Sequence, residues 1–64
     1  MKKIGFIGLG VMGYPMAGHI QSSGYKVSVF NRTKKKALDW EAEYLGHVSP
    51  SVAKLSIDSD YIFL

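Results

Sequence analysis

The 64-residue chain contains no cysteine. It can therefore form neither a disulfide framework nor a cysteine-based zinc site, and neither can add to the marginal stability of so short a domain. Nothing in the composition indicates an oxidising compartment, and we expect a cytoplasmic protein. Hydrophobic residues make up 47% of the chain, which is typical of a folded globular domain rather than a disordered segment.

Long hydrophobic runs are also missing. No stretch reaches the roughly 20 apolar residues that cross a membrane, so we expect no membrane partner. Lys2 and Lys3 precede an apolar stretch over residues 4–12, as in a secretory signal. Glycines in and beside this stretch would each weaken the helix that a signal needs by about 1 kcal/mol relative to alanine, which disfavours that interpretation.

Acidic residues are absent from residues 1–36, which carry seven lysines and arginines, whereas residues 37–64 carry five acidic residues and one lysine. We therefore expect any anion-binding function to lie in the first half of the chain. Three consecutive lysines, residues 34–36, could suggest a nucleic-acid contact. No aromatic residues alternate with them, and we expect no nucleic-acid partner.

Hydrophobic patterning predicts that strands alternate with helices. The expected strands are residues 3–7, 26–30, 47–48 and 60–64, and the expected helices are residues 11–23, 34–45 and 50–55. The first helix should begin near Gly10, because Pro15 is tolerated only within the first turn. Gly24 and Gly46 should end the first two helices.

Side chains on the helices are assigned to the core by their spacing. The second helix should bury Leu38, Ala42 and Leu45, with Ala37 and Trp40 beside them. Met12, Met16 and Ile20 of the first helix should pack on the sheet. Ser49 should cap the third helix, with Pro50 at its first helical position. His19 and His47 have no acidic or nucleophilic partner at a telling spacing, so we expect neither to be catalytic.

The order β-α-β-α-β-α-β predicts an α/β fold, a Rossmann-like parallel sheet with helices on its faces. Four strands correspond to the first half of such a sheet, truncated. If the fourth strand pairs with the first, residues 62–64 form an outer edge without a neighbour, and such an edge favours association.

Three glycines fit the pattern G-x-G-x-x-G: Gly8, Gly10 and Gly13. The pattern is weak alone, but here it follows an expected strand, opens an expected helix and precedes a second strand that ends roughly 20 residues later. This context favours a dinucleotide site over ordinary turn glycines. The helix dipole and free N–H groups would bind the pyrophosphate without a metal. The expected phosphate-binding residues are Gly8, Leu9, Gly10, Val11, Met12 and Gly13.

Polar residues at the end of the second strand predict which cofactor binds. NAD-specific sites place an acid there for the ribose 2′-hydroxyl, whereas an arginine accommodates the 2′-phosphate of NADP. This chain has Asn31 and then Arg32, followed by Thr33 and Lys34. We therefore expect all four to contact the cofactor, and NADP to be preferred over NAD. The lysines that follow Lys34 are equally compatible with a solvated surface.

The segment from Gly5 to Ala17, with residues 29–33 and 60–64, resembles the β-hydroxyacid dehydrogenase family. That family includes 3-hydroxyisobutyrate dehydrogenase and, more distantly, 6-phosphogluconate dehydrogenase. The resemblance implies a full enzyme that oxidises a β-hydroxy acid, or reduces the matching semialdehyde, with a nicotinamide cofactor. In the family the catalytic lysine and asparagine, and the helical domain that forms the oligomer, would lie beyond Leu64.

Residues 1–64 are accordingly expected to form the truncated NAD(P)-binding domain of a homo-oligomeric oxidoreductase. They would contain no catalytic residue and no metal site, and the hydroxy-acid substrate would bind only to the full-length enzyme. A stand-alone nucleotide-sensing module is the alternative. The sequence that the gene encodes after Leu64 would distinguish the two.

Overall fold

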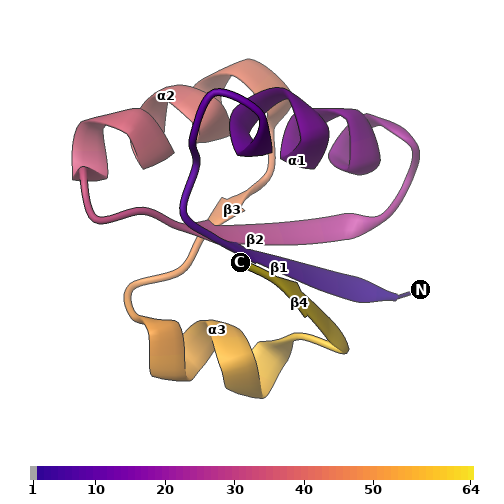
Figure 1. The fold of residues 1–64 in the computed structure, drawn as a ribbon. Helices are drawn as coiled ribbons and strands as arrows, with labels where there is room; N and C mark the ends of the chain where they lie inside the picture. The colour runs from indigo at the N-terminus through magenta and orange to yellow at the C-terminus, as the bar shows by residue number, and fades with distance from the viewer. Residues whose placement is uncertain (1) are drawn as a thin grey trace.

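Four parallel strands form one sheet in the order β3-β2-β1-β4 in the computed structural model, which describes residues 2–64 (Figure 1). The strands are β1 (Lys3–Ile7), β2 (Lys26–Phe30), β3 (His47–Val48) and β4 (Tyr61–Phe63). The helices are α1 (Gly13–Ser22), α2 (Lys34–Tyr44) and α3 (Val52–Asp58). The predicted Rossmann-like parallel sheet is confirmed, including the pairing of the fourth strand with the first.

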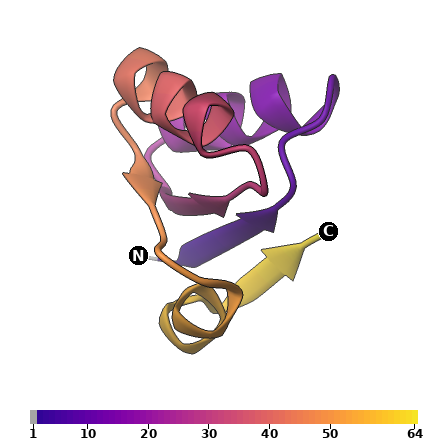
Figure 2. The ribbon, with the colours of Figure 1, turned by 90° about the vertical axis from the view of Figure 1, so that its left-hand side faces the viewer.

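Helices cover both faces of the sheet. Figure 2 shows α1 and α2 together on one face and α3 alone on the other. Because side chains alternate along a strand, each strand contributes to both layers. Ile4 and Phe6 of β1, with Val27 and Val29 of β2, are buried in the core that α1 and α2 cover.

The opposite face carries Gly5, whose missing side chain makes room for α3. A Cβ atom at Gly5 would lie 2.5 Å from Cδ2 of Leu55. The register places Ser28 beside Gly5 and His47 beside Ser28, so these three residues share the α3 face. Leu55 is the buried anchor of α3.

The predicted apolar face of α2 is wrong. Leu38, Ala42 and Leu45 are exposed, and the helix buries Ala37 and Trp40, the two residues expected beside that face. Trp40 is fully buried and its ring packs on Gly46, where a Cβ atom would lie 2.2 Å from the indole. Tyr44 packs partly buried against the same core.

Helix ends differ from the prediction in two places. Gly24 ends α1 with a positive φ of 103°, as expected, but at the end of α2 the left-handed residue is Leu45, with φ 58°. Position 46 therefore requires glycine because a side chain would overlap the ring of Trp40, and not because of its own backbone conformation. The third helix is capped by Ser51, which accepts a hydrogen bond from the N–H of Lys54, and not by Ser49.

The start of α1 also lies later than predicted. The first helical hydrogen bond runs from the N–H of Tyr14 to the carbonyl of Gly10, but regular helix begins at Gly13. Pro15 is the third helical residue, so its place in the first turn is confirmed. Met12 and Met16 are 73% and 46% exposed, contrary to their predicted packing on the sheet, whereas Ile20 packs against the core as predicted. No helix in residues 2–64 has the length and apolar character of a membrane span.

Candidate cofactor-binding site

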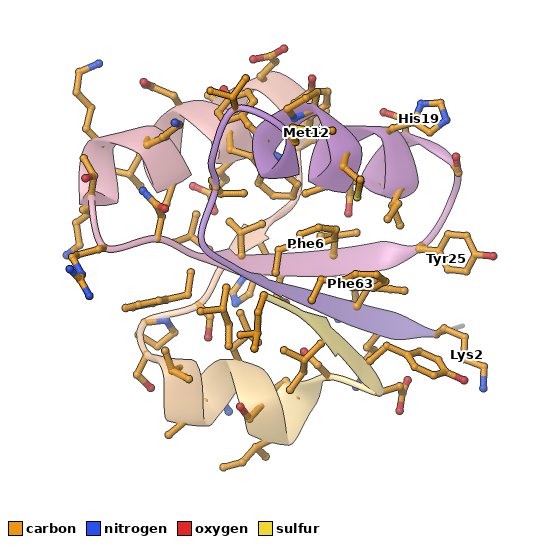
Figure 3. The ribbon with its side chains drawn as sticks, viewed as in Figure 1. Lys2, Phe6, Met12, His19, Tyr25 and Phe63 are labelled. Carbon is orange, nitrogen blue, oxygen red and sulfur yellow. The ribbon has the colours of Figure 1, made fainter. Side chains whose placement is uncertain are left out.

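The segment Gly8–Gly13, called the glycine segment below, leaves the carboxyl end of β1 and turns into α1 (Figure 3, where Met12 is labelled). Gly8 makes the turn with a φ of +93°, a backbone conformation that residues other than glycine rarely adopt. Its N–H donates to the carbonyl of Phe30 at 2.8 Å, which extends the pairing of β1 with β2 by one residue. The turn is thereby fixed to the central strands.

Gly10 lies at the open side of the segment. A Cβ atom there would meet no protein atom within 4 Å, so the space over its backbone is free. Among the described residues, no protein acceptor is found for the N–H groups of Gly10, Val11 and Met12. Helix α1 has no side-chain cap and no acidic residue in its first turn. These N–H groups and the helix dipole are consequently available to an anion.

Gly13 lies close to the turn. A Cβ atom at Gly13 would come within 3.1 Å of the Gly8 carbonyl oxygen, which is tighter than ordinary contact. The absence of a side chain therefore lets the start of α1 pack closely on the preceding turn. Val11 is 90% exposed and, with Met12, forms the rim of the segment.

Leu9 anchors the glycine segment in the hydrophobic core. Its side chain is buried in the core, with 2% of its surface exposed. Its backbone N–H donates to Oδ1 of Asn31 at 2.8 Å. The side chain of Leu9 thus points away from the open side of the segment, and its N–H is already bonded.

Asn31 follows β2 and connects both segments that border the site. Its Oδ1 accepts from Leu9, and its Nδ2 donates to the carbonyl of Thr33 at 3.0 Å. These two partners fix the orientation of the amide, because an N–H needs an acceptor and a carbonyl needs a donor. Asn31 therefore holds the start of α2 next to the glycine segment.

The residues after Asn31 are exposed and carry positive charge. The side chains of Arg32 and Lys34 form no ion pair or hydrogen bond with any described residue. Lys35, by contrast, pairs with Asp39 at 3.3 Å. Thr33 is the residue before α2, and its hydroxyl makes no capping hydrogen bond. Two cations and a hydroxyl are thus free beside the carboxyl end of β2.

A cavity of about 460 Å³ opens beside these residues, between the end of β2, helix α2 and the segment after β3. Ser49 holds that segment against β2, because its N–H donates to the carbonyl of Val29 at 2.8 Å. The cavity is lined by Phe30, Asn31, Lys34, Ala37, Leu38, Glu41, Val48, Ser49 and Pro50.

Several of these lining residues were missed by the sequence analysis. The sequence predicts Leu38 in the core, and Ser49 and Pro50 at a helix start. The available signal was that β3 ends at Val48, so the following residues lie at the same sheet edge as Asn31. Ligands of open parallel sheets bind at this edge.

The residues present fit a dinucleotide. Free backbone N–H groups and a helix start suit a pyrophosphate, the open backbone at Gly10 allows its close approach, and the largely apolar cavity can hold a flat ring. Arg32 lies in the chain between Asn31 and Lys34, which both line the cavity. No group of three or more His, Asp or Glu residues in residues 2–64 is placed to hold a metal ion.

Tyr14, the residue after the glycine segment, joins α1 to α2. Its hydroxyl donates to Oε1 of Glu43 at 2.9 Å, and its ring packs edge-on against Tyr44 with 6.0 Å between centroids. Partial burial and this hydrogen bond to a carboxylate raise the pKa of Tyr14 to about 12. Gly18 allows the contact between the helices, because a Cβ atom there would lie 2.2 Å from the Tyr44 ring.

Comparison with known proteins agrees with this geometry. Residues 3–64 match the family described as the NAD binding domain of 6-phosphogluconate dehydrogenase. The chain is 44% identical over 63 residues to an uncharacterized oxidoreductase of Shewanella frigidimarina, with 98% of the chain aligned. It is 45% identical over 64 residues to the probable mitochondrial 3-hydroxyisobutyrate dehydrogenase-like protein 1 of Arabidopsis thaliana, with 95% aligned.

A solved structure is similar in fold as well. The reductive aminase from Aspergillus terreus, in complex with NADPH and ethyl levulinate, superposes with a TM-score of 0.82 at 29% identity over 97% of the chain. The chain spans 22% of the Shewanella protein, 18% of the Arabidopsis protein and 22% of the aminase. The similarity therefore concerns one part of considerably longer proteins.

Proposed function

Because this chain belongs to the family of NAD binding domains of 6-phosphogluconate dehydrogenase, whose cofactor is a nicotinamide dinucleotide, we propose that it binds NADP(H) in preference to NAD(H). The observation that carries the preference is the pair Asn31–Arg32. Both hydrogen-bonding ends of the Asn31 amide engage the backbone, and position 31 carries no carboxylate that would repel a 2′-phosphate. Arg32 is exposed and unpaired among the described residues.

The glycine segment is proposed to bind the pyrophosphate. Gly10 and the two residues after it offer N–H groups that have no protein acceptor in residues 2–64. Gly8 and Gly13 shape the turn, and Leu9 holds it to Asn31. Each of the residues Gly8, Leu9, Gly10, Val11, Met12 and Gly13 thus has a place in the proposed site, Leu9 by anchoring the backbone rather than by touching the cofactor.

The adenosine is proposed to occupy the cavity beside β2, with its ribose 2′-phosphate near Arg32, Thr33 and Lys34. Leu38 and Pro50 offer apolar walls for the ring. The guanidinium of Arg32 can bind a phosphate with two parallel hydrogen bonds, and Lys34 adds a second cation. The reductive aminase, whose structure contains NADPH, shares this fold.

The chain is proposed to serve as the cofactor-binding part of an oxidoreductase that acts on β-hydroxy acids or the matching semialdehydes. The similarity to a probable 3-hydroxyisobutyrate dehydrogenase-like protein supports this substrate class. The cofactor, when bound, supplies or accepts a hydride. Catalytic residues are proposed to lie outside residues 1–64, in a helical domain that also forms a homo-oligomer, and a reducing compartment such as the cytoplasm suits a chain without cysteine.

Titration of the 64-residue chain with NADPH and with NADH tests the preference. We expect NADPH to bind about tenfold more tightly, because a charge-assisted hydrogen bond pair is gained. Arg32→Ala should remove that advantage while leaving NADH affinity nearly unchanged. Lys54→Ala, an equal loss of charge on α3, should alter neither affinity. Equal affinity of the unmodified chain for both cofactors would refute the proposal.

A further inference from the structure

A second cavity, of about 270 Å³, lies on the α3 face of the sheet. It is lined by Lys3, Lys26, Ser28, His47 and Asp58. The lysines begin β1 and β2, whereas the glycine segment and Asn31 follow the ends of these strands. A five-residue strand is about 13–17 Å long, so this cavity is separate from the proposed cofactor site.

The strand register concentrates positive charge at this cavity. Lys3 pairs with Lys26 in the parallel sheet, so both side chains leave the same face from neighbouring positions. Like charges directly opposite each other destabilise a sheet. The ion pairs found in residues 2–64 are Lys35–Asp39 and Lys54–Asp58. No carboxylate of these residues therefore lies within 4 Å of the ammonium group of Lys3 or of Lys26.

Ser28 adds a hydrogen-bonding group to the cavity. It lies on the central strand β2, only 9% of its surface is exposed, and it lines the cavity. Its hydroxyl makes no hydrogen bond with any described residue. The only completely enclosed side-chain nitrogen or oxygen atom without a partner in residues 2–64 is Nε1 of Trp40. The Ser28 hydroxyl is therefore an unpartnered polar group that reaches the cavity space.

The remaining polar residues complete the site. His47 lies beside Ser28 in the register, on β3, and can donate a hydrogen bond from its ring. Asp58 also lines the cavity, but its carboxylate is 3.4 Å from Nζ of Lys54, which compensates its charge. The uncompensated charge in the cavity is thus positive, and a hydroxyl and an imidazole line the cavity together with the two cations.

We propose that this cavity binds a small dianion of the phosphate type. Lys3 and Lys26 would neutralise its charge, and Ser28 and His47 would donate hydrogen bonds to its oxygens. A bound dianion would relieve the repulsion between the two ammonium groups and give the Ser28 hydroxyl a partner. The site lies outside the proposed cofactor site and does not depend on it.

The test is an amide ¹H–¹⁵N NMR titration of the 64-residue chain with inorganic phosphate, at ionic strength held constant with chloride. We expect saturable shifts of the amides of Ser28 and His47 and their strand neighbours. Shifts of the glycine segment would report the separate phosphate affinity of the cofactor site. Shifts of the α3 face that do not saturate, or shifts confined to the glycine segment, would overturn the proposal.

Three variants assign the effect to the cavity. Lys26→Gln should weaken phosphate binding at the α3 face about tenfold, because one charge-assisted contact is lost. Lys35→Gln removes an equal charge from α2 and should leave this affinity unchanged. Ser28→Ala should weaken binding roughly threefold and decides the matter if Lys26→Gln does not fold. Unchanged affinity in Ser28→Ala would contradict the assignment, whatever happens at the glycine segment.

Discussion

Asn31 accepts a hydrogen bond from the backbone N–H of Leu9, with 2.8 Å between the two atoms. The same amide donates to the carbonyl of Thr33 at 3.0 Å. A single side chain therefore joins the glycine segment to the start of α2. An aspartate at this position could accept from Leu9, but it could not donate to Thr33, and two oxygens would face each other. The neutral amide thus serves the fold as well as the proposed cofactor preference.

Asn31→Ala should lower the free energy of unfolding by about 1–3 kcal/mol, because the partly buried N–H of Leu9 loses its acceptor. Urea unfolding of the 64-residue chain measures this. Thr33→Ala is the matched control. It removes a hydroxyl without a capping bond and keeps the carbonyl that Asn31 uses, so we expect a change below about 0.5 kcal/mol. Equal losses of unfolding free energy in both variants would mean that the hydrogen bonds of the Asn31 amide do not stabilise the fold.

Gly8→Ala and Gly10→Ala should differ in which property they affect. At Gly8, the φ of +93° makes any side chain strained, and we expect a loss of about 1–2 kcal/mol in unfolding free energy. At Gly10, a Cβ atom meets nothing within 4 Å, so stability should hardly change. NADPH binding by Gly10→Ala should nevertheless fall, because the methyl group occupies the approach to the backbone. Normal NADPH affinity in Gly10→Ala would place the pyrophosphate elsewhere.

The sheet could be predicted from the sequence because its strands are short apolar runs bounded by clear turn signals. β1 and β2 match the predicted ranges at every residue, and Gly8 has the positive φ that a tight turn after β1 requires. The buried face of α2 could not be predicted in this way. Ala37, Trp40 and Tyr44 compete with Leu38, Ala42 and Leu45 at equally helical spacings. The packing of Trp40 on Gly46, six residues later, decides between them.

The candidate site, too, could be predicted from the sequence only in part. The turn that carries the glycines is local, so their spacing is sufficient to predict the sharp turn at Gly8. The role of Asn31 in holding Leu9 joins residues 22 positions apart and needs the pairing of β1 with β2. The wall formed by Ser49 and Pro50 depends on β3 lying beside β2, a contact that no local pattern encodes. Residue spacing therefore predicts the candidate site, whereas long-range strand pairing determines its shape.

Gly46→Ala should destabilise the chain by about 2–4 kcal/mol, because the new methyl group would overlap the buried indole of Trp40 and cannot move away from a fixed backbone. Leu45→Gly should have the opposite sign. Leu45 is 82% exposed and has a φ of 58°, so glycine relieves strain of up to about 1 kcal/mol and loses little packing. Thermal and urea unfolding measure both changes. A tolerated Gly46→Ala would contradict the tight packing at Trp40.

Tyr14 should make stability depend on pH in the alkaline range. Its pKa is raised from 10.0 to about 12 in the folded chain by partial burial and by the hydrogen bond to Glu43. The folded state therefore holds the phenolic proton more tightly, so this stabilisation is complete below pH 10 and is lost as the pH rises towards 12. Difference absorbance of tyrosinate, against Tyr14→Phe, measures the titration.

Glu43→Gln tests the physical origin of that shift. Removing the acceptor charge should lower the pKa of Tyr14 towards its ordinary value, with partial burial still holding it somewhat above. Glu41→Gln removes the same charge from the same helix without touching the Tyr14 hydroxyl, and we expect no comparable decrease. A similar decrease in both variants would assign the effect to the general field of α2 instead of the hydrogen bond.

The outer edge of β4 should make the 64-residue chain self-associate at high concentration. In residues 2–64 this strand pairs with β1 alone, and its side chains are all exposed. Unpaired strand edges recruit further strands, and lysine on such an edge opposes this. Sedimentation should therefore show concentration-dependent association that Ile62→Lys suppresses. Ile57→Lys makes the same change at an exposed site on α3 and should leave association intact. Equal suppression by both variants would show that added charge, not the strand edge, controls association.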